Sequence, residues 1–306
     1  MKCRVCRAPA VLDIRRHNAA FCREHFVKHC RDQVRRAIDD HDMISPGERV
    51  LVAVSGGKDS LALWDLLVGL GYEADGLYLG LGIDEYSAAS GRAARTFAGE
   101  RGLRLREVDL ALEYGYDVPG AAATTHRSPC GACGLSKRHV FNSVAVEDGY
   151  DVVATGHNLD DEAAVLLGNV LRWETGYLGR QHPILPASPG FARKVKPLYR
   201  LGERETAAYC VLVGIDYQVE ECPMAEGNRH LGYKGALNAL EDRSPGAKAA
   251  FVFGFVDHAH DRFADEAVAE RDDLHPCVVC GSPTTSDVCA FCRLRERVGS
   301  RAVHAQ

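Results

Sequence analysis

The sequence predicts an α/β domain with a parallel sheet, flanked at its N- and C-terminal ends by zinc ribbons. Short runs of β-branched and apolar residues alternate with longer stretches of helix-forming residues across the middle of the chain. Cysteine pairs with the spacing of zinc ligands lie near both ends. A strand-like run, Val50 to Val54, leads directly into a glycine-rich turn and a helix-forming stretch.

The expected elements follow from these patterns in chain order. Strands are expected at residues 50–54, 73–79, 103–108 and 151–155, and helices at 26–38, 60–70, 86–101, 136–147, 158–172, 203–214 and 229–242. Residues 173–197 are rich in glycine and proline, so we expect an extended loop there. We therefore divide the chain into an N-terminal ribbon (1–33), a catalytic domain (34–270) and a C-terminal ribbon with a tail (271–306).

Length and composition are those of an ordinary globular protein. The chain has 306 residues, of which 46% are hydrophobic and 26% charged. No secretory leader and no apolar run of the roughly 18 residues that a membrane span needs can be found, so we expect a cytoplasmic protein without a membrane partner. The net charge of -5 gives no overall case for nucleic-acid binding, although basic residues cluster at 15–16, 31–36 and 193–200.

Eight of the ligand-type residues fall into two terminal sets. The N-terminal set is Cys3, Cys6, Cys22 and His25, and the C-terminal set is Cys277, Cys280, Cys289 and Cys292. Each set consists of two tight turns with two ligands each, which together make a tetrahedral cage without an open position. Such small ribbons depend on the metal for folding, so we predict two structural Zn²⁺ ions.

The glycine-rich turn Ser55-Gly56-Gly57-Lys58-Asp59-Ser60 is a predicted phosphate site. Backbone N–H groups and a helix N-terminus point at an anion in this arrangement, and Lys58 adds a positive charge. The spacing excludes the Walker A loop and the dinucleotide fingerprint, which both need other glycine positions.

A second turn, Gly156 to Glu162, also follows a strand and opens a helix. Its three acidic residues suit the positive end of the helix dipole, and beside a phosphate site they can also hold Mg²⁺. Lys137 could reach the same phosphates as a point charge.

Three cysteines of the middle of the chain, Cys130, Cys133 and Cys222, belong to neither ribbon. They are compatible with a redox pair that forms a disulfide or persulfide, with an iron–sulfur cluster that keeps one iron without a protein ligand, or with buried packing. Cys30 and Cys210 stand among apolar or helical residues, and we assign both to packing.

Taken together, these motifs resemble the tRNA 2-thiouridine synthetases of the TtcA/TtuA superfamily, which belong to the PP-loop ATP pyrophosphatases with a HUP-like fold. The resemblance rests on the SGGxDS-type loop at Ser55–Ser60, the CxxC pair at Cys130, the turn at Gly156, Cys222-Pro223 and both ribbons. It is strongest for the TtuA-like branch with two zinc ribbons, whose members thiolate the T-loop ribothymidine or the wobble uridine.

The resemblance implies a role for particular residues. Those implied to bind ATP are Ala53, Ser55, Gly57, Lys58, Asp59, Ser60, Leu79 and Gly156. Lys137 and Asp161 would assist adenylation with Mg²⁺. Cys130, Cys133 and Cys222 would hold a [4Fe–4S] cluster, with Cys130 and Cys222 counted among the catalytic residues. Residues 80–85 depart from the family's more polar stretch, which bears on the adenine contacts.

The implied reaction is uridine 2-thiolation of tRNA. ATP would adenylate the uracil C2 oxygen, and sulfide held by the cluster would replace it. The family takes this sulfur from a ubiquitin-like carrier with a C-terminal thiocarboxylate or from free sulfide, and often dimerises. Three alternatives stay open: the same reaction by persulfide or disulfide chemistry, an amide-forming ATP pyrophosphatase, and a non-enzymatic zinc-ribbon module that binds nucleic acid as a redox sensor.

Overall fold

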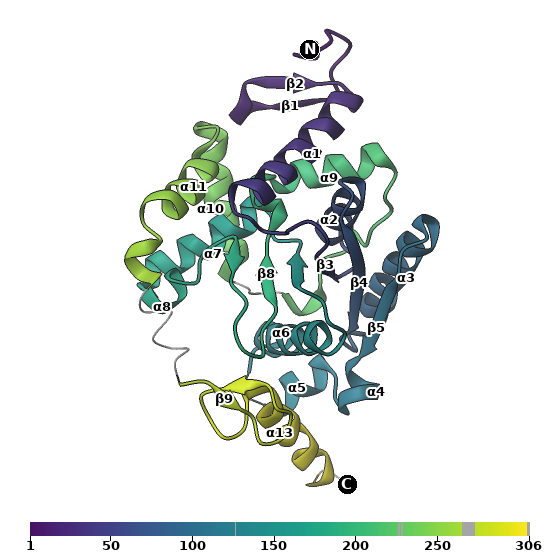
Figure 1. The fold of residues 1–306 in the computed structure, drawn as a ribbon, viewed down its shortest axis with the longest axis vertical. Coiled ribbons are helices and arrows are strands. Elements are labelled where there is room, and N and C mark those ends of the chain that lie inside the picture. The colour runs from purple at the N-terminus through teal and green to yellow at the C-terminus, as the bar shows by residue number, and fades with distance from the viewer. Residues whose placement is uncertain (126, 226, 228, 265–272, 305–306) are drawn as a thin grey trace.

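The computed structural model describes residues 1–125, 127–225, 227, 229–264 and 273–304 (Figure 1). Its centre is a six-stranded sheet with the order β5-β4-β3-β6-β8-β7. These strands are β3 (Arg49–Val54), β4 (Glu73–Gly80), β5 (Leu105–Asp109), β6 (Val152–Thr155), β7 (Ile184–Leu185) and β8 (Arg193–Val195). All neighbouring pairs are parallel except β7 with β8, so the predicted parallel sheet is confirmed and carries one antiparallel edge strand.

The helices connect and cover these strands. They are α1 (Arg23–Asp40), α2 (Lys58–Gly69), α3 (Asp84–Arg101), α4 (Leu110–Tyr114), α5 (Val118–Thr124), α6 (Pro129–Glu147), α7 (Leu159–Arg172), α8 (Thr175–Leu178), α9 (Glu203–Val213), α10 (Arg229–Arg243), α11 (Ala247–His258) and α13 (Ala290–His304). Short 3₁₀ turns occur at η1 (Arg15–His17), η2 (Pro197–Arg200) and η3 (Pro223–Ala225). Every strand and helix expected from the sequence is present, and the ends shift by at most three residues except at α6. That helix is expected from Ser136 but begins at Pro129, so it includes Cys130 and Cys133.

The expected extended loop at 173–197 is wrong in part. It contains α8 and a short hairpin, in which β7 pairs with β8 and β8 pairs with β6. Strands of two and three residues are too short to show periodicity, and their pairing depends on the neighbouring strand β6 rather than on local sequence.

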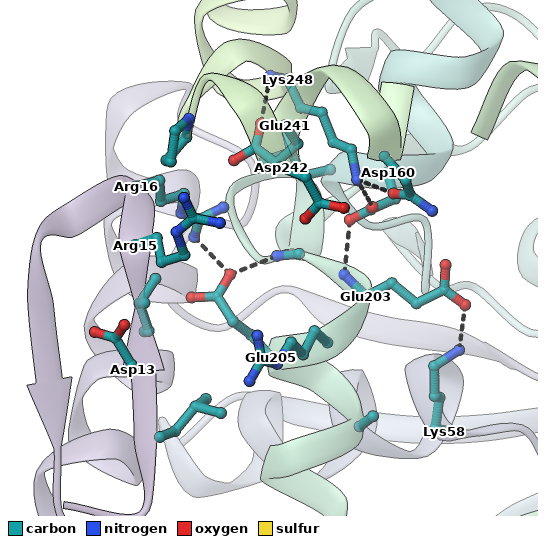
Figure 2. A pocket seen from close by; sticks show the side chains of 18 residues that line it. Asp13, Arg15, Arg16, Lys58, Asp160, Glu203, Glu205, Glu241, Asp242 and Lys248 are labelled. Carbon is teal, nitrogen blue, oxygen red and sulfur yellow. Dashed lines mark hydrogen bonds and ion pairs between the residues drawn. The ribbon is translucent and has the colours of Figure 1, made fainter. Parts of the chain in front are cut away.

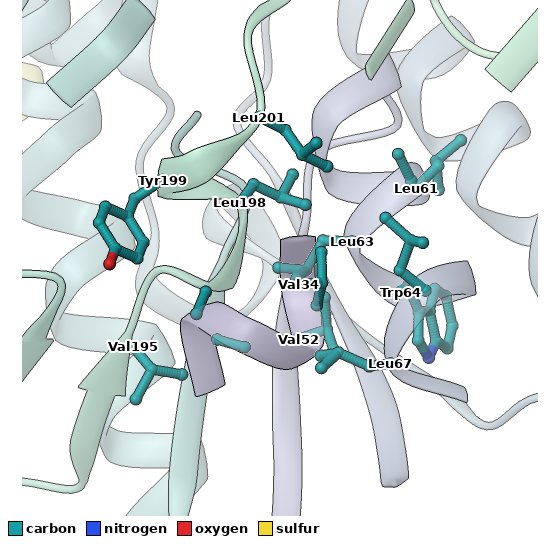
Figure 3. Close-up of a cluster of buried hydrophobic side chains, with 14 of the residues drawn as sticks. Val34, Val52, Leu61, Leu63, Trp64, Leu67, Val195, Leu198, Tyr199 and Leu201 are labelled. Atoms are coloured by element: carbon teal, nitrogen blue, oxygen red, sulfur yellow. The ribbon is translucent and has the colours of Figure 1, made fainter. Parts of the chain in front are cut away.

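Both faces of the sheet are buried, as the continuous apolar run of β3 requires. Val50, Val52 and Val54 face one hydrophobic core, which α1, α2 and α9 also line, whereas Leu51 faces a second core shared with α6. Figure 3 shows the first core, in which Trp64 and its neighbours on α2 meet β3 and η2. Trp64 also donates to the backbone oxygen of Ala74 at 2.9 Å, which fixes α2 on β4.

The two ribbons lie at opposite ends of the molecule (Figure 1). The N-terminal ribbon contains the hairpin β1 (Leu12–Ile14) and β2 (Ala19–Phe21), and the C-terminal ribbon contains β9 (His275–Pro276) and β10 (Pro283–Thr284). Phe291 of the C-terminal ribbon stacks on His139 of α6 with ring centroids 3.8 Å apart, so this ribbon packs on the second core. In the part of the chain that the structure describes, every helix is too short or too polar to cross a bilayer.

The strand order creates a switch point between β3 and β6. From β3 the chain builds the sheet outward through β4 and β5, and then returns to place β6 on the other side of β3. At such a point the chain leaves two adjacent strands toward opposite sides of the sheet, so the loops that follow the strands diverge. The divergence leaves a crevice at the carboxyl ends of the strands, where open α/β sheets bind ligands. The loops after β3 and β6 are those that carry the two glycine motifs.

Candidate active site and metal centres

A cavity of about 370 Å³ opens at this switch point. Seven of the residues assigned to nucleotide binding or adenylation line it, namely Ala53, Ser55, Asp59, Ser60, Leu79, Lys137 and Gly156. Polar groups of the loop form one end, while Leu79, Leu81 and Phe141 make an apolar wall. A polar end beside an apolar wall matches a nucleotide, whose phosphates are charged and whose base is flat and largely apolar.

The loop after β3 is held in a shape that points its backbone at the cavity. The Ser60 hydroxyl donates to the Gly57 oxygen at 3.0 Å and accepts from the Ser55 N–H at 3.1 Å. Gly56 has φ +77°, and a Cβ there would lie 2.2 Å from the Ser90 carbonyl oxygen. Only glycine combines this positive φ with the close approach to Ser90. Gly57 is the N-cap of α2, so the N–H groups of the first helical turn are available to an anion.

The loop after β6 buttresses the first one. Asn158 caps α7 through its side chain, and Asp161 returns a bond to the Asn158 N–H at 3.1 Å. The Asn158 amide also donates to Asp59 at 3.1 Å, which ties the two motifs together. Gly156 passes so close that a Cβ would meet the Ser60 nitrogen at 2.9 Å.

Lys58 and Asp161 do not line the cavity in this structure. Lys58 Nζ lies 2.8 Å from Glu203 and 3.1 Å from Asp59. Burial alone would lower the pKa of Lys58, but the carboxylates of Asp59 and Glu203 raise it above its ordinary value. Asp161 pairs with Lys234 of α10 at 2.7 Å. Both predicted residues therefore stand beside the cavity, each held by an ion pair that the sequence did not suggest.

The three central cysteines come from two segments that the fold brings together. Cys130 and Cys133 lie in the first turns of α6, whose N-cap is Ser128, and Cys222 immediately precedes η3. The Cys130 thiol lies 3.8 Å from the Met224 oxygen, so η3 packs against the start of α6. Cys133 and Cys222 are half-buried, and Cys130 is exposed.

Tyr86 connects these thiols to the cavity. It lines the cavity, and burial raises the pKa of its phenol, with smaller contributions in the same direction from Cys222 and Cys133. Gly134, the neighbour of Cys133, lines the cavity as well. In the described residues the three sulfur atoms do not form a set within 4.8 Å of one another, so they are spread more widely than ligands of a single ion. Cysteine thiolates are the usual ligands of iron–sulfur clusters, so these three cysteines fit such a cluster by the chemistry of their side chains.

The N-terminal set fits zinc closely. The ligand atoms of Cys3, Cys6, Cys22 and His25 all lie within 4.8 Å of one another, and the sulfur atoms of Cys6 and Cys22 are 3.7 Å apart. Tetrahedral zinc with Zn–S bonds of about 2.3 Å separates its sulfur ligands by about 3.8 Å. Burial opposes ionisation of Cys3, but backbone N–H groups of the two turns lower the pKa of its thiol to about 6.

The C-terminal set, Cys277, Cys280, Cys289 and Cys292, has the same geometry. All four sulfur atoms lie within 4.8 Å of one another, with Cys280 and Cys289 3.7 Å apart. The Cys289 N–H donates to the Cys277 sulfur at 3.2 Å. Burial opposes ionisation here too, yet such backbone donors lower the pKa of the Cys277 thiol to about 6, as a zinc-binding turn requires.

A third cluster, His17, His29 and Glu205, has ligand atoms equally close but a different character. It borders a second cavity of about 570 Å³ between the N-terminal ribbon and α9 (Figure 2). The Arg16 guanidinium contacts two members of this cluster: it pairs with Glu205 at 2.7 Å and donates to the His17 ring at 3.1 Å. A guanidinium already neutralises the only carboxylate, so we assign this cluster to a buried ion pair between ribbon and body rather than to a metal.

Sequence reasoning missed Tyr86, Glu203 and Lys234, which sit between the predicted motifs. Nothing local distinguishes them, since each stands in an ordinary helix sequence and gains its role from tertiary packing. Cys30 and Cys210 are fully buried, which confirms their assignment to packing. The basic clusters are largely engaged in ion pairs, for example Arg193 with Glu48 at 2.8 Å.

Comparison with known proteins identifies relatives of this chain. Residues 2–27 match the family model described as the N-terminal LIM domain of the 2-thiouridine synthetase TtuA. A curated tRNA-5-methyluridine(54) 2-sulfurtransferase of Thermus thermophilus is 53% identical over 302 residues, covering 99% of this chain and 93% of that protein. Its Pyrococcus horikoshii namesake is 41% identical, covering 96% of this chain and 93% of that protein.

A solved structure supports the same relationship. It is the U34-tRNA thiolase NcsA from Methanococcus maripaludis with its [4Fe-4S] cluster, which superposes with a TM-score of 0.80 at 26% identity and covers 97% of this chain and 96% of that one. The resemblance inferred from the motifs is thereby confirmed. This chain belongs to the family of tRNA 2-thiouridine synthetases.

Proposed function

We propose that this protein is a tRNA sulfurtransferase that converts a uridine C2 carbonyl to a thiocarbonyl at the cost of one ATP, released as AMP and pyrophosphate. The observation that carries the proposal is the position of Tyr86 and Gly134, which line the cavity; Tyr86 lies near enough to Cys222 and Cys133 to interact electrostatically, and Gly134 follows Cys133 in the chain. Activation and sulfur delivery need to happen at one carbon, so the two kinds of site have to share a cleft.

ATP binding is assigned to the loop at the switch point. The β- and γ-phosphates would meet the N–H groups at the start of α2 and the hydroxyls of Ser55 and Ser60. The adenosine would lie along Ala53 and Leu79 on the apolar side of the cavity. Asp161 is the residue assigned to hold Mg²⁺, which would supply positive charge to the phosphates of ATP.

In the adenylation step the uracil C2 oxygen attacks the α-phosphorus, a new P–O bond forms, and the bond to the β-phosphate oxygen breaks. Charge develops on the phosphorane oxygens and on pyrophosphate. Lys137 faces this cavity from α6 and would stabilise that charge without moving a proton.

In the second step a sulfur nucleophile attacks C2 and AMP leaves with the former carbonyl oxygen. Cys130, Cys133 and Cys222 would hold a [4Fe–4S] cluster, which when bound supplies an iron corner without a protein ligand where sulfide can be kept for transfer. Tyr86 and Phe141 form the apolar rim that would orient the uracil ring and exclude water from the adenylate.

The substrate position, sulfur donor and assembly are part of the proposal. The relatives at 53% and 41% identity are named for 5-methyluridine 54, so we propose that T-loop nucleoside over the wobble uridine. A ubiquitin-like carrier with a C-terminal thiocarboxylate, or free sulfide, would supply sulfur to a cytoplasmic homodimer. Each chain would carry two zinc ions, and would be divided into units at 1–33, 34–270 and 271–306 as the sequence suggests.

The test is thiolation in vitro by anaerobically reconstituted protein with ATP, Mg²⁺, sulfide and unmodified tRNA, read by mass spectrometry of the nucleosides. Cys222→Ser should abolish 2-thiouridine formation and lower the amount of bound iron. Cys30→Ala removes a buried thiol that belongs to none of the proposed ligand sets, and this variant should keep both the product and the iron. Full thiolation by Cys222→Ser would remove the cluster from the reaction. Thiolation by a preparation without iron would instead favour persulfide chemistry.

A further inference from the structure

A closed ring of ion pairs and hydrogen bonds joins Lys58 and Asp59 of the ATP loop to polar residues of neighbouring elements. All of its contacts are between side chains except one, in which the Asn158 backbone N–H donates to Asp161. Consecutive members lie 2.7 to 3.1 Å apart, and the ring runs Lys58, Asp59, Asn158, Asp161, Lys234, Glu203 and back to Lys58. Its members come from α2, the cap and first turn of α7, α9 and α10. Figure 2 shows the Glu203 to Lys58 pair at the edge of the second cavity.

Lys234 occupies a particular place in this ring. Its Nζ lies 2.7 Å from Asp161 Oδ1 and 3.1 Å from Glu203 Oε2. The other carboxylate oxygen of Asp161 accepts a hydrogen bond from the Asn158 N–H, and the other carboxylate oxygen of Glu203 pairs with Lys58. Lys234 is therefore the link that joins the acidic turn after β6 to the lysine of the phosphate loop.

Helix packing fixes where this ammonium stands. Gly168 of α7 leaves room for Tyr233, because a Cβ at Gly168 would lie 2.8 Å from the Tyr233 ring. Arg172 of α7 donates to the Tyr233 hydroxyl at 3.4 Å. The neighbour of Lys234 is thus seated on α7, and its own side chain, 23% exposed, reaches along α7 toward the N-terminal turn.

We propose that Lys234 is a positioning residue for the ATP-dependent step, which holds Asp161 and, through Glu203, Lys58 in the geometry that adenylation requires. The inference rests on the proposed function, since it assigns Asp161 and Lys58 to Mg²⁺ and phosphate. No substrate contact is assigned to Lys234 itself.

A purely structural ion pair would behave differently. Exposed pairs contribute about 0–1 kcal/mol to stability, and their loss leaves a rate unchanged. Removing Lys234 instead leaves two carboxylates and one ammonium without their link. Misplacing a catalytic group by about one ångström costs up to about 100-fold in rate.

Burial alone would raise the pKa of Glu203, whereas Lys58 and Lys234 lower it below its ordinary value. Loss of Lys234 should therefore move the acid limb of the pH–rate profile to higher pH, because Glu203 then protonates more readily and releases Lys58.

The test compares Lys234→Met and Lys234→Arg with Lys28→Met in the full reconstituted protein. Lys28 of α1 is 68% exposed and pairs with Asp32 of the same helix, so its replacement removes the same charge away from the site. AMP release in the presence of tRNA is measured as a function of ATP, Mg²⁺ and pH, and thermal unfolding is recorded for each variant.

The proposal expects Lys234→Met to lose about 10- to 100-fold in kcat, with KM for ATP changed by less than about threefold. Its acid limb should shift upward, and Lys234→Arg should recover most of the rate. Equal kcat and pH profile in Lys234→Met and Lys28→Met would overturn it. Tighter Mg²⁺ binding with undiminished kcat would also overturn it, because Lys234 would then be a competitor of the metal. If the wild-type protein releases no AMP with tRNA, the proposed function itself fails.

Discussion

A single methyl group at Gly156 should weaken ATP binding without unfolding the protein. In Gly156→Ala the new Cβ would lie 2.9 Å from the Ser60 nitrogen and 3.0 to 3.1 Å from the carbonyl carbon and oxygen of Asp59. These are backbone atoms, which cannot rotate away as the end of a side chain can. Gly156 has no left-handed φ, so the substitution strains only this contact.

The structure sets the size of the effect. Overpacking of this kind costs about 1–3 kcal/mol. The phosphate loop is the side that can yield, because Gly156 is anchored by β6 and by the capped start of α7. If the loop moves by a few tenths of an ångström, most of that cost appears in binding, which corresponds to ATP affinity weaker by about 5- to 150-fold.

Calorimetric titration with a non-hydrolysable ATP analogue measures this loss, and Gly99→Ala is the matched control. Gly99 is exposed on α3, and a Cβ there meets nothing within 4 Å. The control should keep wild-type affinity and gain up to about 1 kcal/mol of stability from the better helix propensity of alanine. Unchanged ATP affinity in Gly156→Ala would refute the placement of the phosphates at this contact.

Three further outcomes are expected. Arg16→Met should lower the free energy of unfolding by about 3–5 kcal/mol, because it leaves the buried Glu205 carboxylate without its guanidinium partner. Denaturant unfolding measures this loss, and a loss below about 1 kcal/mol would contradict the buried ion pair. Burial lowers the pKa of His139 from 6.5 to about 4, so the unfolded chain takes up the proton first and stability should fall as the pH drops from about 6.5 to about 4. His139→Phe keeps the stacking on Phe291 and should flatten the pH dependence of the melting temperature. An unaltered pH dependence in this variant would contradict the assignment. Cys289→Ser should lower zinc, measured by mass spectrometry of the metal, from two ions to one per chain, and two retained ions would argue against the C-terminal cage.

Local sequence was sufficient wherever a motif carries its own geometry. The run at 50–54 is apolar on both faces, and its glycine turn has few alternatives to a strand–loop–helix unit, so β3, the loop and α2 were predictable. The two terminal ligand clusters were predictable for the same reason, because CxxC and CxxH turns bring their own ligands together and need little from the rest of the fold.

Tertiary pairing decided the remainder. The strand at Arg193 exists because β6 offers it a free edge, and the strand at Ile184 then pairs with it; no local periodicity records either pairing. Lys234 and Glu203 reach the ATP loop only because α10 packs on α7 and α9 packs on α2. Tyr86 comes near Cys222 and Cys133 only through the tertiary fold. Motif spacing in the sequence identified residues that can bind phosphate or metal, and tertiary packing decided which side chains form hydrogen bonds and ion pairs with them.

The most direct measurement is the ratio of AMP released to 2-thiouridine formed in one anaerobic reaction of the reconstituted protein with tRNA and sulfide. The account predicts that both products require Mg²⁺ and ATP and appear in a ratio close to one. AMP without incorporated sulfur would contradict it and would favour an amide-forming ATP pyrophosphatase. Sulfur incorporation without any AMP would contradict the assignment of the glycine loop to activation.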